Sequence, residues 1–168
     1  MRKITIGFSK PSHFRIGAAL IRIVEQTEFS HTYVKIGDDI WQESLPKFNK
    51  VGVLDFQKDH IIVCAYILNV TDEQYDKITE FCEYCLRLRI PYGTTQIVGM
   101  AIVRMINQLF HCKFKNPFAD GPKTMVCSEF VGEVLEIMGV KIDPRLLELE
   151  GPKLIRKIVT ELSVNQVM

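Results

Sequence analysis

A chain of 168 residues with 47% hydrophobic and 24% charged residues has the size and composition of one globular domain, so we expect residues 1–168 to fold as a single unit. Its formal net charge of +1 provides neither the basic field typical of nucleic-acid-binding proteins nor an acidic field suited to cations. The five cysteines follow no regular spacing, which argues against a disulfide scaffold and favours reduced thiols.

The sequence carries no recognisable targeting or membrane-spanning signal. Residues 1–7 begin with positive charge, but the long apolar stretch of a signal peptide does not follow. The most apolar stretch, residues 97–106, is interrupted by Gly99 and Arg104 and falls short of the roughly 20 residues that span a bilayer. We therefore expect a cytoplasmic protein without a transmembrane segment. Delivery outside the cell by lysis or injection would leave no mark in the sequence.

The N-terminal elements are a short strand and an amphipathic helix. Residues 3–8 alternate weakly and are β-prone, which predicts a strand. Ser12 can cap the helix that follows, which extends to about Glu25. Apolar side chains recur along this helix at i, i+3, i+4, i+7 and i+8, so we expect that face to cover the core. The face consists of Ile16, Ala19, Leu20, Ile23 and Val24.

A β-hairpin is predicted next. Residues 30–36 and 40–44 read as strands on either side of a turn at residues 37–39. A three-residue loop places Tyr33 opposite Glu43. Because side chains alternate across a strand, one face of the hairpin then carries five polar or aromatic side chains. These are His31, Tyr33, Lys35, Trp41 and Glu43. A two-residue loop would instead move Glu43 to the opposite face.

Two further strands and a capped helix follow the hairpin. Residues 51–54 and 61–68 are β-prone, and Thr71–Gln74 has the spacing of a capping box that opens a helix. Cys82 and Cys85 lie on the apolar stripe of that helix with no second pair nearby. This placement is typical of core packing rather than of a metal or redox site. The stripe consists of Tyr75, Ile78, Cys82, Cys85 and Leu86.

The C-terminal half contains three helical patterns. Residues 94–110 are apolar nearly all round, which favours burial or contact with another apolar surface, and we expect burial. The adjacent His111-Cys112 pair is a poor metal site without further ligands. A helix that starts at or near Cys127 is expected to end with Gly139 as its C-cap, and a last helix opens at Gly151-Pro152.

Cys127 is the candidate nucleophile. A cysteine on a helical stripe usually packs in the core, but Cys127 also follows a loop and stands at the start of its helix. At that position the backbone N–H groups and the helix dipole favour a thiolate, and the same N–H groups can act as oxyanion donors. Position alone therefore allows either a packed thiol or a reactive one.

His31 is the candidate base, because a thiol nucleophile needs a neighbouring imidazole to take its proton. It is the one histidine predicted to lie inside a strong strand, and the others fall in loops or at strand edges: His13, His60 and His111. A histidine on a strand can instead fill a hydrogen bond of the core. In the three-residue-loop register, Glu43 can orient the ring and Tyr33 can add a hydroxyl. The alternatives are a solvated carboxylate and a cross-strand aromatic pair.

Two motifs resemble a known superfamily. Ser30-His31 in an early strand and Cys127-Ser128-Glu129-Phe130-Val131 at a late helix start resemble the circularly permuted, YiiX-like branch of the NlpC-type papain-like superfamily. In that branch the histidine strand precedes the cysteine helix, and a carboxylate follows at the place of Glu43. Tyr92-Gly93 and Asp143-Pro144 also match its common Tyr-Gly and turn proline. The likeness covers roughly residues 4–152.

The chain also departs from related patterns. Thr32-Tyr33 follows the histidine where this branch more commonly has a small Val-Gly pair, which bears on the shape of the site and on its substrate. The related lecithin retinol acyltransferase-like branch has Asn-Cys-Glu-His at its helix start, and residues 126–129 do not match that pattern well.

The resemblance implies an α+β fold in which helices pack on a small, curved antiparallel sheet with a permuted papain-like topology. It also implies a cysteine peptidase- or amidase-like hydrolase that cleaves an amide bond, with a peptide, such as a cell-wall peptide, as substrate. In this interpretation Cys127 is the nucleophile, His31 the base and Glu43 its orienter. Candidate substrate-binding or auxiliary residues are Tyr33, Trp41, Ser128 and Tyr92. No metal or organic cofactor is implied.

Two alternatives use the same residues differently. The first is a lipid or acyl ester hydrolase or acyltransferase with the same site, which exposure of the apolar residues 97–109 beside Cys127 would favour. The second is a non-catalytic papain-like module that binds a ligand or partner, which a normal titration of the Cys127 thiol would favour. The sequence leaves the substrate and the oligomeric state open.

Overall fold

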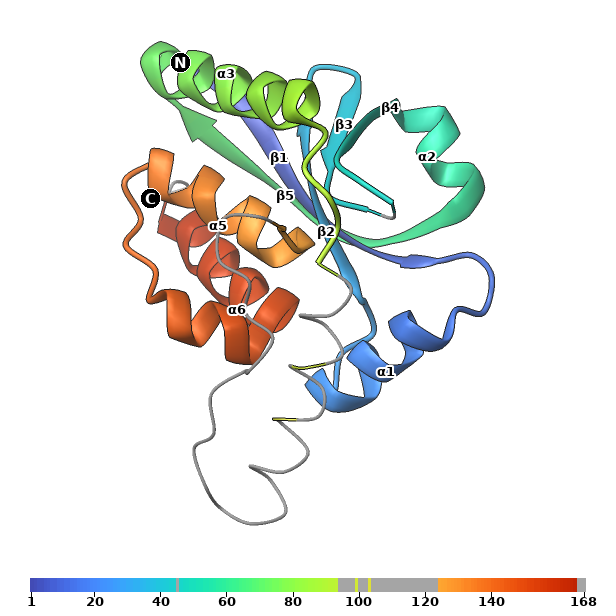
Figure 1. Cartoon of the computed structure of the whole chain (residues 1–168). Helices are drawn as coiled ribbons and strands as arrows, with labels where there is room; N and C mark the ends of the chain where they lie inside the picture. Colours follow the sequence, from blue (N-terminus) through green and yellow to red (C-terminus); the bar gives the residue numbers. More distant parts are fainter. Residues whose placement is uncertain (45, 94–98, 100–102, 104–123, 166–168) are drawn as a thin grey trace.

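A five-stranded antiparallel sheet with the spatial order β4-β3-β2-β1-β5 organises the chain in the computed structural model (Figure 1). The structure describes residues 1–44, 46–93, 99, 103 and 124–165. The fold is α+β, as expected from the sequence. The strands are β1 (Arg2–Pro11), β2 (His31–Ile36), β3 (Asp39–Gln42), β4 (Asn49–Gly52) and β5 (His60–Val70).

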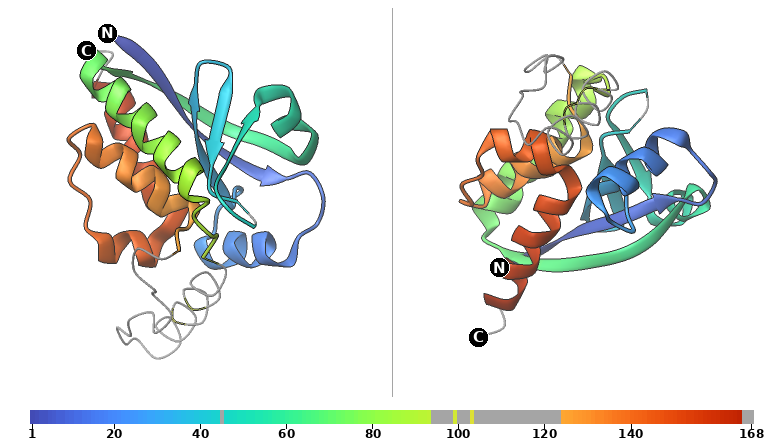
Figure 2. Two further views of the ribbon diagram at one scale, coloured as in Figure 1. Left: turned by 45° about the horizontal axis from the view of Figure 1, so that its top comes forward. Right: turned by 90° about the horizontal axis from the view of Figure 1, so that it is seen from below.

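The described helices divide between the two faces of the sheet. They are α1 (Ile16–Glu25), α2 (Val53–Asp59), α3 (Asp72–Leu88), α5 (Cys127–Ile137) and α6 (Pro144–Asn165). Figure 2 shows α3, α5 and α6 gathered on one side of the sheet. There the even-numbered residues of β1 and β2, such as Ile6 and Val34, pack against Phe130 and Val131 of α5. On the other face Phe56 of α2 joins Tyr33 and Ile40 in a smaller cluster. None of the described helices is both long and apolar enough to cross a bilayer.

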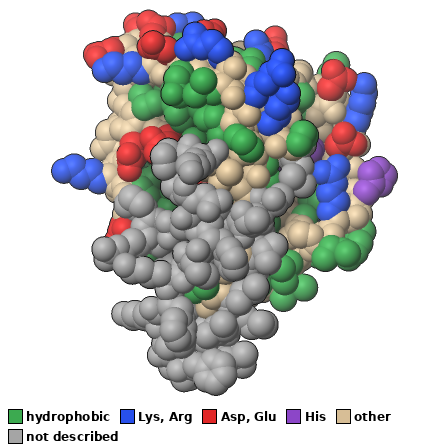
Figure 3. Space-filling view, in the orientation of Figure 1, with side chains coloured by type: hydrophobic (Ala, Val, Ile, Leu, Met, Phe, Trp, Pro, Cys, Tyr) green, Lys and Arg blue, Asp and Glu red, His purple; other side chains and the backbone are tan. Residues whose placement is uncertain are grey.

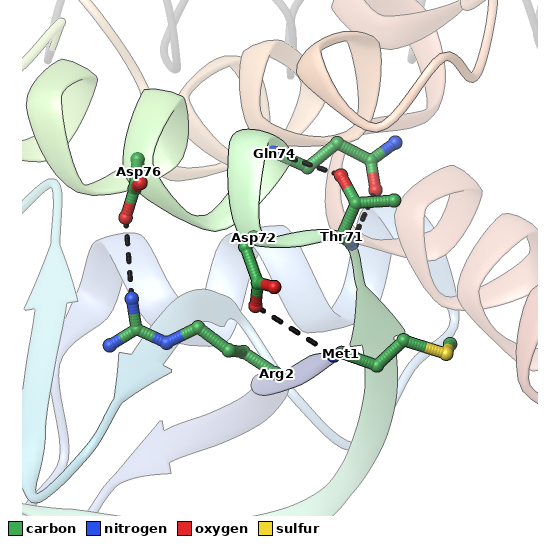
Figure 4. Close-up of polar contacts among 6 residues, drawn as sticks. All are labelled: Met1, Arg2, Thr71, Asp72, Gln74 and Asp76. Carbon is green, nitrogen blue, oxygen red and sulfur yellow. Dashed lines mark hydrogen bonds and ion pairs between the residues drawn. The ribbon is translucent and has the colours of Figure 1, made fainter.

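Helix α3 begins where its capping residues predict. The Thr71 hydroxyl accepts a hydrogen bond from the Gln74 backbone N–H at 3.1 Å, and the Gln74 side chain accepts one from the Thr71 N–H at 2.9 Å (Figure 4). The Arg2–Asp76 ion pair, at 3.2 Å, links the start of β1 to the same helix. Ile78, Cys82 and Cys85 are buried, so the predicted apolar stripe packs in the core. The described cysteines are free thiols: Cys64, Cys82, Cys85 and Cys127.

The β2–β3 hairpin corrects the predicted register. Ile36 pairs with Asp39 and Val34 with Trp41, so the loop has two residues, Gly37 and Asp38, instead of three. Gly37 has a φ of 61°, the left-handed value that a two-residue turn with glycine in its first position requires. The shift by one residue divides the side chains that were predicted to share one polar face between the two faces of the sheet. His31 and Tyr33 remain together, whereas Trp41 and Glu43 lie on the opposite face of the sheet.

Three other predicted elements compare differently with the structure. The predicted strand at residues 51–54 is β4, which ends at Gly52, and α2 begins directly after it because Phe56 packs beneath the sheet. The predicted last helix does open at Gly151-Pro152: α6 (Pro144–Asn165) consists of two helical segments joined by a kink at Gly151, where φ is 45°, and the segment before the kink is the part that the sequence did not predict. The predicted helix over residues 94–110 lies outside the described residues, apart from residues 99 and 103.

The apolar face of α1 does not cover the core, contrary to the prediction. Ile16 and Ile23 are 78% and 74% exposed, and Leu20 is 39% exposed. The buried residue of the helix is Glu25, whose carboxylate accepts a hydrogen bond from the Lys153 backbone N–H at 3.1 Å. Contact with the kinked region of α6 thus sets the orientation of the helix, because the buried carboxylate has to reach this donor.

The Tyr33 ring leaves no room for a side chain at Gly7 in β1. A Cβ atom added at Gly7 would overlap the Tyr33 ring, which crosses the glycine from the neighbouring strand. We expect Gly7→Ala to lower the free energy of unfolding by about 1–3 kcal/mol through overpacking. In the matched control Gly17→Ala, the added Cβ meets no atom within 4 Å, and helix propensity raises stability by up to about 1 kcal/mol. Urea unfolding monitored by circular dichroism measures both. Equal stability of the two variants would contradict the close contact.

Candidate active site

Cys127 lies at the point where α5 meets the sheet. It is the first residue of the helix, is 3% exposed, and its sulfur receives hydrogen bonds from the backbone N–H groups of Thr32 and Ser128. The start of α5 lies beside β2 in Figure 1. The β2–β3 ladder ends at the Val34–Trp41 pair, which leaves the Thr32 end of β2 open toward the helix. The thiol therefore occupies the place where a strand partner would continue.

Local capping fixes the first turn of α5. The Glu129 side chain accepts a hydrogen bond from the Val126 backbone N–H at 2.8 Å. This contact satisfies a backbone donor that the helix leaves free, and it places a negative charge in the first turn, where the helix dipole favours it. In the Cys-Ser-Glu part of the sequence motif, Glu129 thus caps the helix. Ser128 is 1% exposed, and its backbone N–H donates to the sulfur.

Tyr92 is held against the cysteine by a short stretch of backbone pairing. Met125 donates to the Pro91 carbonyl at 3.2 Å, and Gly93 donates to the Met125 carbonyl at 3.0 Å, which forms a parallel bridge between Tyr92 and Met125. The Tyr92 hydroxyl makes a side-chain hydrogen bond with Cys127. Burial, followed by Cys127 and Glu43, raises the pKa of Tyr92 well above its ordinary value. The tyrosine therefore stays protonated beside the sulfur.

The thiol of Cys127 is neutral in this conformation. Burial raises its pKa to about 12, and the nearby carboxyl groups of Glu25 and Glu43 act in the same direction. The N–H groups of Thr32 and Ser128 lower the pKa, but not enough to offset burial. The expectation of a low-pKa thiolate is thus wrong for the described conformation, because the helix terminus is covered and the predicted imidazolium is missing.

His31 is also neutral and lies on the opposite face of the sheet from Cys127. Its Nε2 is 2.8 Å from the Gln42 Oε1, and its ring centroid is 5.6 Å from that of His60. Burial lowers the pKa of His31 to about 3, with His60 and Arg15 adding to the effect, while the Gln42 hydrogen bond opposes it. The ring is 8% exposed.

The predicted orienter of His31 is wrong. Gln42, rather than Glu43, holds the imidazole, because the two-residue turn places residue 42 on the histidine face. The sequence did not indicate Gln42, because a three-residue loop would place residue 42 on the face away from His31. The hydrogen bonds between described residues include none between His31 and Cys127. The two stretches nevertheless meet, since Thr32, next to the histidine, donates to the sulfur.

Glu43 is a carboxyl group buried in the core. The side chain is completely buried, and neither of its oxygens makes a hydrogen bond with another residue that the structure describes. Burial, followed by the charge of Glu129, raises its pKa to about 8. The carboxyl group also raises the pKa of Cys127 and Tyr92, so it faces the same cluster. A buried carboxyl in this setting is protonated at neutral pH and can donate a hydrogen bond.

The two aromatic site residues predicted on the hairpin, Tyr33 and Trp41, lie on opposite faces of the sheet. Tyr33 is buried on the His31 face, with its ring 4.8 Å from that of Phe56, and burial raises its pKa to about 12. Trp41 is buried on the Glu43 face beside Phe48, at 6.5 Å between ring centroids. No group of three or more potential metal ligands occurs among the residues that the structure describes.

The family and sequence comparisons add no relative. No protein-family model matches the chain, and no curated protein sequence matches it. The resemblance to the permuted NlpC-type superfamily therefore stays a prediction.

Protonated Glu43 predicts a pH dependence of stability. Its pKa is higher in the folded chain than in the unfolded one, so its contribution is complete below about pH 4.5 and is lost as pH rises toward 8. We expect the stability of wild type relative to Glu43→Gln to fall by up to about 1.4 kcal/mol per pH unit across this window. Urea unfolding from pH 5 to 8 measures the difference. The exposed Glu80→Gln serves as control, and parallel profiles for wild type and Glu43→Gln would refute a protonated Glu43.

Proposed function

We propose that the chain is a thiol-dependent hydrolase that cleaves an amide bond by nucleophilic attack of Cys127. The observation that carries the proposal is the pair of backbone N–H groups, from Thr32 and Ser128, aimed at a sulfur in the first turn of α5. These donors stabilise negative charge on the sulfur as soon as its proton leaves. A helix-terminal thiol that only fills the core needs no such donors. The superfamily resemblance favours a peptide substrate and a permuted papain-like topology.

His31 is the base in this proposal. Gln42 occupies its Nε2, so the thiol proton goes to Nδ1, and because the ring lies on the opposite face of the sheet, the proposal requires the Thr32 end of β2 to rearrange and bring the ring to the sulfur. A neutral thiol and a neutral imidazole imply that proton transfer accompanies the attack, as in general base catalysis, instead of preceding it as an ion pair. The sulfur then bonds to the carbonyl carbon, and the imidazolium returns the proton to the leaving amine.

The remaining site residues have roles in accommodating the substrate. The backbone N–H of Cys127 is the proposed oxyanion donor, because it points from the first turn of α5. Tyr92 makes a hydrogen bond with the sulfur, so the substrate carbonyl has to displace its hydroxyl. The thiol is 3% exposed, which means that neighbouring side chains move when a substrate binds. Water then hydrolyses the acyl–sulfur bond with His31 as base.

Two alternative functions each have an observation in their favour. The raised pKa of Cys127 and its lack of a hydrogen bond to His31 favour a non-catalytic papain-like module that binds a ligand or partner. The exposed apolar side chains of α1, the helix whose Glu25 raises the pKa of Cys127, favour a lipid or acyl ester as substrate of the same thiol. A test of acyl transfer to Cys127 separates the first alternative from both enzymatic ones.

Acylation of the thiol tests the proposed nucleophile. We expect wild type to release p-nitrophenol from p-nitrophenyl acetate and to carry the acetyl group on Cys127, as read by peptide mass spectrometry. Cys127→Ser abolishes both signals, and His31→Ala slows turnover by roughly 10²–10⁴-fold because the base is lost. Cys64→Ser, at a half-buried thiol away from α5, is the control and leaves the rate unchanged. Turnover that survives in Cys127→Ser would favour the binding module.

The role of Gln42 is tested through the pH profile of the same reaction. Gln42→Glu places a carboxylate where an amide oxygen now accepts from the imidazole, so it raises the pKa of His31. We expect the acidic limb of the rate profile to move to higher pH in Gln42→Glu. Gln42→Leu removes the hydrogen bond and lowers kcat more than it raises KM. If the acidic limb has the same midpoint in wild type and Gln42→Glu, Gln42 does not position the base.

A further inference from the structure

Helix α1 presents its apolar stripe outward. Ile16, Leu20 and Ile23 recur at i, i+4 and i+7, and Phe14 precedes the helix with 80% of its surface exposed. Figure 3 shows hydrophobic side chains on the surface in the region of α1, at the lower right of the view. A monomeric protein seldom exposes several large aliphatic and aromatic side chains side by side. This cluster therefore needs an apolar environment that the described residues do not provide.

The orientation of α1 is held by polar contacts on its other side. Glu25 is 5% exposed and accepts a hydrogen bond from the Lys153 backbone N–H of α6. The left-handed Gln26 closes the helix with its N–H on the Arg22 and Ile23 carbonyls, and Thr27 donates to the Arg22 carbonyl at 3.1 Å. Turning the apolar stripe inward would remove the buried carboxylate from its donor. The outward direction of the stripe is thus a stable feature of the fold.

The charged residues within the segment of the stripe are basic, while the acidic Asp59, whose carbonyl accepts from the Ser12 N–H, and Glu28 lie beyond its two ends. Residues 10–24 contain Lys10, Arg15 and Arg22 and no aspartate or glutamate, although the chain as a whole has a net charge of only +1. Lys10 and Arg15 flank the exposed Phe14. A helix with large apolar residues on one side and basic residues around it has the composition of helices that lie in the interface of an anionic membrane.

Helix α1 also adjoins the candidate site. Glu25 at its C-terminal end raises the pKa of Cys127, and Arg15 at its N-terminal end lowers the pKa of His31 and His60. The two charges act on the two halves of the site from opposite ends of one helix. The ends of the helix that carries the exposed stripe are thus coupled to the thiol and to the imidazole.

We propose that α1 docks the protein on an anionic lipid surface, with Phe14, Ile16 and Ile23 among the acyl chains and with Lys10 and Arg15 at the headgroups. A second copy of the chain is a poorer occupant, because a symmetric pairing through α1 would bring the same basic residues together. Docking does not require the proposed hydrolase activity. If both hold, the substrate is an amphiphile presented at the membrane.

Vesicle binding tests the docking surface, with Cys127→Ser as the background so that turnover plays no part. We expect it to sediment with phosphatidylcholine–phosphatidylglycerol vesicles and much less with phosphatidylcholine alone. Ile16→Ser combined with Ile23→Ser weakens binding about tenfold or more, because both side chains leave the acyl region. The matched control combines Leu54→Ser with Ile67→Ser, which are 80% and 61% exposed away from α1, and it binds normally. Lys10→Gln with Arg15→Gln removes the preference for phosphatidylglycerol.

Three outcomes would overturn the proposal. The first is that the Cys127→Ser protein binds neither vesicle. The second is that the Ile16/Ile23 variant and its control bind equally while both unfold with the stability of the parent. The third is a dimer, measured by light scattering, that the Ile16/Ile23 variant loses while vesicles do not bind, since the second copy would then be the occupant of the stripe.

Discussion

Side chains of strand β2 pack into two hydrophobic clusters, one on each face of the sheet. The arrangement of the site depends on how these side chains alternate between the two faces. Val34 and Ile36 pack under α5 and α6, while His31 and Tyr33 pack toward α2. The two-residue turn at Gly37 carries this alternation into β3, so that Gln42 joins the histidine and Glu43 joins the cysteine helix. The backbone of Thr32 is where the two halves meet, since its N–H reaches the Cys127 sulfur in the plane between the faces.

The titratable side chains that are buried on the two faces of the sheet are uncharged. His31, Cys127 and Glu43 are all buried, and burial moves the pKa of each toward its neutral state. A resting site with a neutral acid, a neutral base and a neutral thiol avoids the cost of buried charge. Charge then has to arise during a reaction. Fixed donors, such as the backbone N–H groups at the start of α5, have to stabilise it.

Much of the fold was predictable because local patterns determine it. The Thr71 capping box, the alternation of β1 and the stripe of the Cys127 helix each specify their element without reference to the rest of the chain. It was harder to predict which face of the sheet or helix each side chain would occupy and what that face would contact. Asp39 suits a turn as well as a strand end, and this one residue of ambiguity exchanged the positions of Gln42 and Glu43. In α1 the apolar spacing identified the helix, but spacing does not reveal which environment an apolar face meets.

Contacts between distant residues were the least accessible to sequence reasoning. The motif around Cys127 identified the helix start, but the sulfur's donor from Thr32 depends on where β3 stops, which no local pattern encodes. Likewise, Glu25 falls at the end of an amphipathic helix and would be expected to face solvent. Its burial reflects a free backbone N–H at Lys153, beyond the backbone kink at Gly151 in α6.

Trp41 gives this protein a built-in optical probe. It is the single tryptophan of the chain, it is 5% exposed, and it stands two residues before Glu43 on β3. Its indole N–H finds no hydrogen-bond partner in the described part of the chain, and the Lys50 ammonium lies 4.8 Å from the ring centre. Emission from one buried indole in so defined a setting reports on β3 alone. Fluorescence can therefore follow rearrangement next to the thiol in the unlabelled protein, separately from the helical signal of circular dichroism.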